Sequence, residues 1–217
     1  MNDSADSISA GESGWEQRLS TALAGSSDLQ PRPLSRMELP LNLDWLIESE
    51  WLASLRRAAV LVPVVDRPEG PTVVLTQRSE QLRNHKGQIS FPGGRRDDDD
   101  IDAADTALRE AEEEIGLPRR HVEVIGYLDD YPTFSLYRVT PVVGVIRDLP
   151  PLRVDAAEVA EAFEVPLSLL LDPASYEQKQ MLRGTVKLPF YEVNYRDYRI
   201  WGATAGMLWE LCRKVNA

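Results

Sequence analysis

The stretch FPGGRRDDDDIDAADTALREAEEEIGL, residues 91–117, decides how the rest of the sequence is interpreted. It begins with a Pro-Gly-Gly turn, crosses a run of aspartates and then shows helical spacing of its apolar residues. Because an α-helix turns by about 100° per residue, four apolar residues fall within about 60° of one another and predict a buried stripe. These residues are Ala104, Leu108, Ala111 and Ile115. Gly116 is expected to end the helix, since glycine readily adopts the left-handed conformation found there.

Three glutamates of this helix, Glu110, Glu113 and Glu114, lie nearly opposite the apolar stripe, whereas Glu112 lies beside it. Carboxylates spaced three and four residues apart destabilise a helix unless a cation lies among them. A solvated acidic face is the usual explanation of such a pattern. Here the glycine turn and the neighbouring Arg109 favour a site for a hard divalent cation such as Mg²⁺, which prefers carboxylate oxygen. Such a metal would recruit a phosphorylated substrate to an acidic protein.

The stretch resembles the Nudix box, whose pattern is G-x5-E-x7-R-E-U-x-E-E-x-G-U, with U an aliphatic residue. Ala111 stands at the first aliphatic position, and the other matches are Gly94, Arg109, Glu110, Glu113, Glu114, Gly116 and Leu117. Two departures concern Asp100, which replaces the first glutamate and is separated from Arg109 by eight residues rather than seven. In the family this first acidic position is less central to metal binding than the later three, so we expect activity to survive.

A second resemblance lies in LTQRSEQLRNHKGQISFPGG, residues 75–94. It is similar to the segment that marks coenzyme A pyrophosphatases within the Nudix superfamily, and it meets every position of that segment. The matching residues are Leu75, Thr76, Arg78, Ser79, Arg83, Gly87, Phe91, Pro92, Gly93 and Gly94. Because a guanidinium suits phosphate oxygens, we expect Arg78 and Arg83 to bind the 3′-phosphate or the diphosphate of the substrate. Gly93 and Gly94 would let the backbone approach the phosphates closely.

Together the resemblances imply an α/β protein with the Nudix fold, an α/β/α sandwich with a mixed β-sheet. They also imply metal-dependent hydrolysis of coenzyme A (CoA) or acyl-CoA to 4′-phosphopantetheine and adenosine 3′,5′-bisphosphate. Mg²⁺ or Mn²⁺ on Glu110, Glu113 and Glu114 would neutralise the diphosphate oxygens and acidify a bound water. Arg109 would hold a glutamate in place. A glutamate of the box, Glu158 or Glu161 would accept the proton of the water, and the sequence leaves this choice open.

Three alternatives stay open at this point. The first is a Nudix pyrophosphatase for ADP-ribose, NADH or another nucleoside diphosphate derivative, against which the CoA-type segment argues. The second is a catalytically silent Nudix ligand sensor, which the intact Glu110, Glu113 and Glu114 disfavour. The third is an acidic interaction domain, for which divalent cations should not change thermal stability.

Composition limits the partners and the location. The net charge of −11 argues against nucleic acid or an anionic membrane as a partner. The single cysteine, Cys212, excludes an internal disulfide and fits a reducing compartment. No apolar run reaches the roughly 20 residues of a membrane span. We therefore expect a cytoplasmic protein with a small-molecule substrate, and a homodimer is left open.

The expected organisation is a flexible acidic N-terminal arm over residues 1–35, followed by one hydrolase domain over residues 36–217. Within the arm, Trp15, Leu19 and Leu23 could seed a short helix. Continuous or alternating apolar residues predict strands over 58–65, 72–76, 122–128, 139–146, 184–195 and 198–201. Helices are expected over 44–56, 166–171 and about 202–214, and residues 158–166 resemble an acidic turn of the family.

Overall fold

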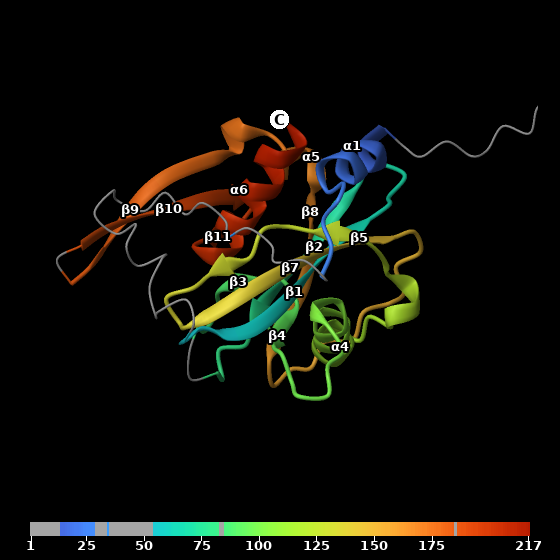
Figure 1. Ribbon diagram of the computed structural model, residues 1–217, viewed down its shortest axis with the longest axis horizontal. Coiled ribbons are helices and arrows are strands. Elements are labelled where there is room, and N and C mark those ends of the chain that lie inside the picture. Colours follow the sequence, from blue (N-terminus) through green and yellow to red (C-terminus); the bar gives the residue numbers. More distant parts are fainter. Residues whose placement is uncertain (1–13, 29–33, 35–53, 83–84, 185) are drawn as a thin grey trace, which may run out of the picture.

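The computed structural model describes residues 14–28, 34, 54–82, 85–184 and 186–217, and its centre is an eight-stranded mixed sheet (Figure 1). Five strands follow one another in the order β3-β2-β1-β7-β5, while β4 pairs with β1, β6 with β7 and β8 with β2. Only the pair of β1 and β7 is parallel. The strands are β1 (Arg56–Val65), β2 (Thr72–Arg78), β3 (Ile89–Ser90), β4 (Gly93–Arg95), β5 (Glu123–Tyr127), β6 (Tyr131–Pro132), β7 (Tyr137–Ile146) and β8 (Val159–Pro166).

The sheet is covered on both faces, as the unbroken apolar run of β1 predicts for a central strand. Ala59 and Leu61 face a core formed with helix α4 (Ala103–Ile115). Val62 and Val64 face the opposite core, to which helix α1 (Gly14–Ala22) and helix α6 (Ala203–Val215) contribute. Figure 1 shows α4 on one side of the sheet and α6 with α1 on the other. The expected α/β/α sandwich with a mixed sheet is confirmed.

Helix α4 has sequence signals at both ends. The Asp102 side chain accepts a hydrogen bond from the Asp105 amide at 2.7 Å and so caps the first turn. Gly116 adopts φ 65° and donates its amide to the Glu112 carbonyl at 3.0 Å. The helix therefore ends at the predicted glycine, and a loop joins its start to the strand β4, which carries Gly93 and Gly94.

A three-stranded antiparallel sheet follows, formed by β9 (Tyr176–Arg183), β10 (Val186–Tyr195) and β11 (Tyr198–Trp201). In Figure 1 the β9–β10 hairpin projects from the main sheet. Helix α5 (Leu167–Leu170) and the short 3₁₀ turns η2 (Arg119–His121) and η3 (Pro173–Ser175) complete the elements of the described residues. Helix α1 lies within the expected N-terminal arm, yet it packs on the body: its Leu19 is fully buried.

One prediction was wrong, and one strand was not predicted. The expected acidic turn over 158–166 is instead strand β8 from Val159, which pairs antiparallel with β2. The expected strand over 184–195 begins only at Val186, because Gly184 lies at φ 62° in a turn after the unforeseen strand β9. The sequence YEQKQMLR of β9 lacks apolar alternation, so its pairing with β10 comes from the tertiary structure.

The other predicted elements lie within a few residues of their expected bounds. The strands β1 and β2 pair antiparallel, as neighbours along the chain. The helix expected over 44–56 falls mostly outside the described residues. Among the residues that the structure describes, no helix has the length and apolar character needed to span a membrane.

Candidate active site

Two neighbouring glycines of β4, Gly93 and Gly94, each lie where a side chain would clash with a different neighbour. Gly93 has φ 153°, and a Cβ there would lie 2.5 Å from the Ala59 carbonyl oxygen of the adjacent strand. A Cβ at Gly94 would lie 2.5 Å from the carboxyl carbon of Glu110. Gly93 therefore permits the close approach of β4 to β1, whereas Gly94 leaves room for the Glu110 carboxyl group.

Glu114 is buried, with 4% of its surface exposed, so the expectation that all three glutamates lie on an exposed face was wrong. Its Oε2 accepts a hydrogen bond from the Gly93 amide at 3.2 Å. Burial raises the pKa of Glu114 to about 8, and the negative charges of Glu110 and Glu158 act in the same direction. The Gly93 amide and the Arg78 cation oppose this shift. Helix α4 packs against β4 as well as β1, and β4 therefore covers the Glu114 side chain.

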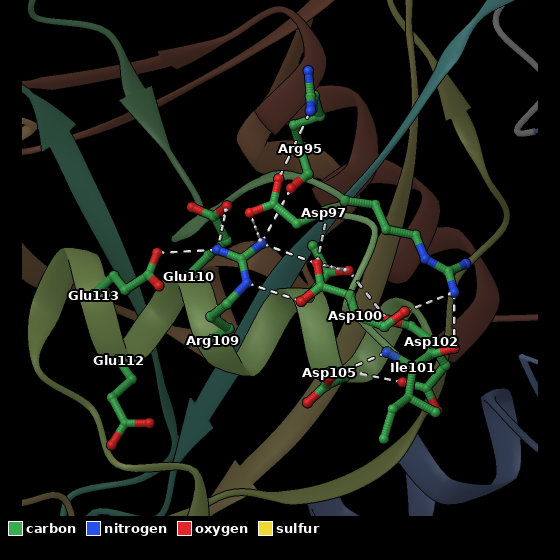
Figure 2. A network of polar contacts seen from close by, with 12 residues as sticks. Arg95, Asp97, Asp100, Ile101, Asp102, Asp105, Arg109, Glu110, Glu112 and Glu113 are labelled. Atoms are coloured by element: carbon green, nitrogen blue, oxygen red, sulfur yellow. Dashed lines mark hydrogen bonds and ion pairs between the residues drawn. The ribbon is translucent and has the colours of Figure 1, made fainter.

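Arg109 forms hydrogen bonds with three acidic residues of the helix and of the loop before it (Figure 2). Its Nε and Nη2 donate to the two Asp100 oxygens at 2.9 and 3.0 Å. Its Nη1 donates to Glu110 Oε1 and Glu113 Oε2, each at 3.0 Å. The expected contact of Arg109 with a glutamate is therefore present, and these carboxylates hold the pKa of Arg109 well above its usual value.

Asp100, the residue that departs from the Nudix box, is buried, and its side chain accepts four hydrogen bonds. Besides Arg109, the Asp97 amide donates to it at 2.8 Å and the Thr106 hydroxyl at 2.9 Å. These bonds, led by those from Arg109, hold the pKa of Asp100 well below its usual range. The Asp100 amide also donates to the Asp97 carbonyl, so the extra residue is accommodated in a turn. The shorter acidic side chain still reaches Arg109.

The other two glutamates of the box differ in exposure. The Glu110 side chain is largely buried, and this burial raises its pKa. The Glu113 side chain is 60% exposed and bonds to Arg109, while Figure 2 shows Glu112 directed away from this group. In the described part of the chain, no three acidic, histidine or cysteine side chains form a complete metal-ligand set.

The end of β2 approaches the glutamates from a second direction. Arg78 lies close enough to Glu114 to lower its pKa, and the buried Nε of Arg78 has no hydrogen-bond partner among the described residues. The next residue, Ser79, donates its amide to the Glu158 carbonyl at 2.8 Å and its hydroxyl to the Ala156 carbonyl at 3.2 Å. This anchoring role of Ser79 was not predicted, although the Arg-Ser pair of the CoA-type segment marks the position. Arg83 lies outside the described residues.

The structure separates the two candidates for a base outside the box. Glu158 is exposed, and its charge raises the pKa of both Glu110 and Glu114, so it belongs to the same acidic group. Glu161 instead lies near Tyr198 of the second sheet, where burial and the neighbouring Glu161 carboxylate raise the pKa of the Tyr198 hydroxyl. Of the two, Glu158 is the residue brought next to the glutamates of the box.

The donors of this group suit a hard divalent cation. Glu110 and Glu114 are two carboxylates with raised pKa values, and Glu158 adds a third negative charge beside them. Their mutual repulsion and burial disfavour the ionised forms, and a bound Mg²⁺ or Mn²⁺ would offset both effects. Arg78, whose Nε has no hydrogen-bond partner among the described residues, provides a donor for an anion.

Comparisons with known proteins show the family to which this chain belongs. A family model of the NUDIX domain matches residues 55–184. The uncharacterized Nudix hydrolase NudL of Escherichia coli (strain K12) is 44% identical over 161 residues, which cover 74% of this chain and 83% of that protein. The NudL protein of Yersinia pestis (strain Pestoides F) is 40% identical over 182 residues, 83% of this chain and 91% of the relative.

Among solved structures, a C. elegans Ap4A hydrolase in a binary complex matches with a TM-score of 0.45 and 18% identity, over 51% of this chain and 80% of that chain. The NUDIX domain of Shewanella oneidensis NrtR complexed with ADP ribose matches with a TM-score of 0.43 and 18% identity, over 61% of this chain and 87% of that one. The family assignment rests on the domain match and on the NudL relatives. This chain belongs to the Nudix hydrolase family, whose members act on pyrophosphate bonds of nucleotide derivatives.

Proposed function

We propose that this protein hydrolyses the pyrophosphate bond of CoA and its derivatives, giving 4′-phosphopantetheine and adenosine 3′,5′-bisphosphate. The observation that carries the proposal is the buried Arg78 Nε, which has no partner among the described residues and belongs to an arginine whose charge lowers the pKa of Glu114. A buried unpaired donor is costly, and a phosphate oxygen of the substrate would satisfy it. Arg78 is also one of the two arginines of the CoA-type segment.

The structure gives several other positions of that segment a role in the fold, which leaves its arginines for the ligand. Phe91 is buried in the core, and the Thr76 hydroxyl lies 3.1 Å from that of Ser90 on the neighbouring strand. Ser79 anchors the turn that carries Glu158. We assign Arg78 to the diphosphate, because it lies next to the glutamates. Arg83 remains a predicted substrate-binding residue.

In this proposal the acidic residues have two separate roles, metal binding and proton acceptance. Glu110, Glu113 and Glu114 would hold Mg²⁺ or Mn²⁺, which neutralises phosphate oxygens and acidifies a coordinated water. Arg109 positions Glu110 and Glu113 through its Nη1. Glu158, exposed and beside the buried pair, accepts the proton of the attacking water. The Gly93 amide contacts Glu114, and Gly94 has no side chain to fill the space beside Glu110. The diphosphate could therefore approach the backbone closely at this point.

The direct test is hydrolysis by the purified protein of CoA, acetyl-CoA, NADH and ADP-ribose, each with Mg²⁺ or Mn²⁺, with the products identified by mass spectrometry. The expected result is a higher kcat/KM for the CoA compounds and the two products named above. Preferential cleavage of NADH or ADP-ribose would contradict the CoA assignment. Tight binding without turnover of any of the four would instead identify a sensor. A cytoplasmic location and a homodimer remain predictions, checked by fractionation and by mass in solution.

A further inference from the structure

A cavity rich in arginine opens at the start of β1, beside the turn that follows β4. Its volume is about 420 Å³, and its lining residues are Arg56, Arg57, Arg95, Arg96, Asp97 and Asp98. Four arginines and two aspartates line this cavity, in a protein whose net charge is −11. The local charge is therefore opposite in sign to that of the whole chain. We call this feature the arginine cavity.

The pairing of β1 with β4 explains why these arginines meet. Ala58 of β1 lies opposite Arg95 of β4, and the Arg96 amide donates to the Arg57 carbonyl at 3.0 Å. Two arginine pairs are thereby placed at the same end of two neighbouring strands. Like charges held this close repel one another, and this repulsion costs stability unless an anion offsets it.

Two of the four arginines have partners within the protein. Arg96 donates through Nη2 to the carbonyls of Asp100 and Ile101 at 3.0 and 2.8 Å, so it holds the aspartate loop. Arg95 approaches Asp97 at 3.8 Å, and Figure 2 shows its side chain extending away from Arg109.

The other two arginines keep their donors available. Within the described residues, the Arg57 side chain makes no hydrogen bond or ion pair. The Arg56 guanidinium lies 4.5 Å from the centre of the Tyr137 ring, a stacking contact that uses none of its N–H donors. Arg56 and Arg57 therefore present unused donors to the arginine cavity.

We propose that the arginine cavity binds a monoester phosphate of the substrate that is separate from the diphosphate being cut. The inference deepens the proposed function and rests on it. Guanidinium donors in a fixed fork suit phosphate oxygens, and a phosphate dianion would offset the repulsion among the arginines. The cavity shares its wall with the catalytic group, because the Arg95 carbonyl accepts a hydrogen bond from Arg109 Nη2 at 3.2 Å. In CoA the group of this kind is the 3′-phosphate.

The test compares ligands that differ only in this phosphate. Arg57→Gln and Arg56→Gln/Arg57→Gln are measured beside Arg120→Gln, which changes an exposed arginine outside the cavity. Calorimetric titration without metal gives the Kd of adenosine 3′,5′-bisphosphate, of AMP and of inorganic phosphate. Kinetics with Mg²⁺ give kcat/KM for CoA and for dephospho-CoA. Melting temperatures confirm that each variant is folded.

We expect the double variant to raise the Kd of adenosine 3′,5′-bisphosphate by about tenfold or more. It should also lower kcat/KM for CoA by a similar factor. AMP binding and dephospho-CoA hydrolysis should change little, and Arg120→Gln should behave as the unmodified protein. The inference would be overturned if the variants lost as much affinity for AMP as for adenosine 3′,5′-bisphosphate, or as much kcat/KM for dephospho-CoA as for CoA. It would also be overturned if neither quantity changed. Binding of inorganic phosphate with no preference for the bisphosphate over AMP would overturn it as well.

The same experiment separates failure of the inference from failure of the proposed function. If the unmodified protein cuts neither CoA nor dephospho-CoA, the CoA assignment fails, yet the binding titrations still test the cavity. If it cuts both and the variants leave their ratio unchanged, the assignment stands and the arginine cavity has no part in substrate binding.

Discussion

Glu114 combines burial with a charge that the proposed reaction requires. In the metal-free protein its pKa is about 8, so at neutral pH the folded state keeps most of this proton. The unfolded chain has an ordinary glutamate, whose pKa is about 4.3. Between these two values unfolding releases a proton, and the free energy of unfolding must therefore fall as the pH rises.

This linkage gives a prediction on pH. The melting temperature of the protein in a chelator should decrease between about pH 5 and pH 8 more steeply than that of Glu114→Gln. Below the unfolded pKa both states are protonated, so the contribution of Glu114 is then fully present. Glu112→Gln, on the exposed side of the same helix, serves as the matched control. Parallel curves for Glu114→Gln and the unmodified protein would show that Glu114 titrates normally.

The same substitution tests the catalytic assignment. Glu114→Gln keeps the shape of the side chain and removes the charge, so kcat should fall at least about 100-fold with Mg²⁺, which corresponds to about 2.7 kcal/mol. Thermal stability at pH 8 should not fall, because a neutral amide costs less to bury than a carboxylate. Activity close to that of Glu112→Gln would place the metal elsewhere.

The two glycines of β4 should respond differently to alanine. Gly94→Ala brings a methyl group against the flexible end of Glu110, so we expect a loss of activity of tenfold or more with little change in stability. Gly93→Ala meets backbone at 2.5 Å and has a strained φ, and it should cost about 2–3 kcal/mol of unfolding free energy. Urea denaturation and kcat of the two variants, measured together, check this contrast. Equal effects on stability would contradict it.

At the scale of elements, the loop between β4 and α4 is fixed to helix α4 by the salt bridge between Asp100 and Arg109. Asp100 accepts both hydrogen bonds of the Arg109 fork and also closes its own turn. An additional residue before the helix is thereby tolerated. The arrangement makes Asp100 a positioning residue, because its influence on Glu110 and Glu113 passes through Arg109.

Asp100→Asn should lower the free energy of unfolding by about 2 kcal/mol near neutral pH, since the bonds from Arg109 lose their charged acceptor. The folded pKa of Asp100 is depressed, so this stabilisation is fully present above the ordinary pKa near 4 and is lost progressively as the pH falls from there toward the depressed folded pKa. Denaturation at pH 7 and pH 3 measures the difference between variant and unmodified protein. Asp99→Asn is the control, and a loss that is the same at both pH values would contradict the role of the charge.

At the scale of the whole molecule, a divalent cation that binds only the folded state must stabilise it. At a concentration of about 100 times its Kd, Mg²⁺ or Mn²⁺ would add about 2.7 kcal/mol, a rise in melting temperature of roughly 5–10 °C for a chain of this size. Calorimetric melting with and without the cations measures the effect, and Glu114→Gln should remove most of it. An unchanged melting temperature would favour an acidic interaction domain.

Much of the fold and of the site could be predicted from short stretches of sequence. The limits of α4 follow from the Asp102 cap, the helical period and Gly116, all of which act within a few residues. The Nudix box and the CoA-type segment likewise located Arg78, Arg109 and the three glutamates. The boundary at residue 35 stays a prediction, although helix α1 packs on α6 from within the expected arm.

Only the tertiary structure decided which glutamate is buried, which base candidate joins the site and which arginines share a cavity. Glu114 is covered by β4, Glu158 is brought in by the pairing of β8 with β2, and Arg57 meets Arg96 through the pairing of β1 with β4. The physical reason is the range of the interactions. Helix caps and periodicity arise between near neighbours in the chain, whereas burial and strand pairing depend on residues that meet only after the chain has folded.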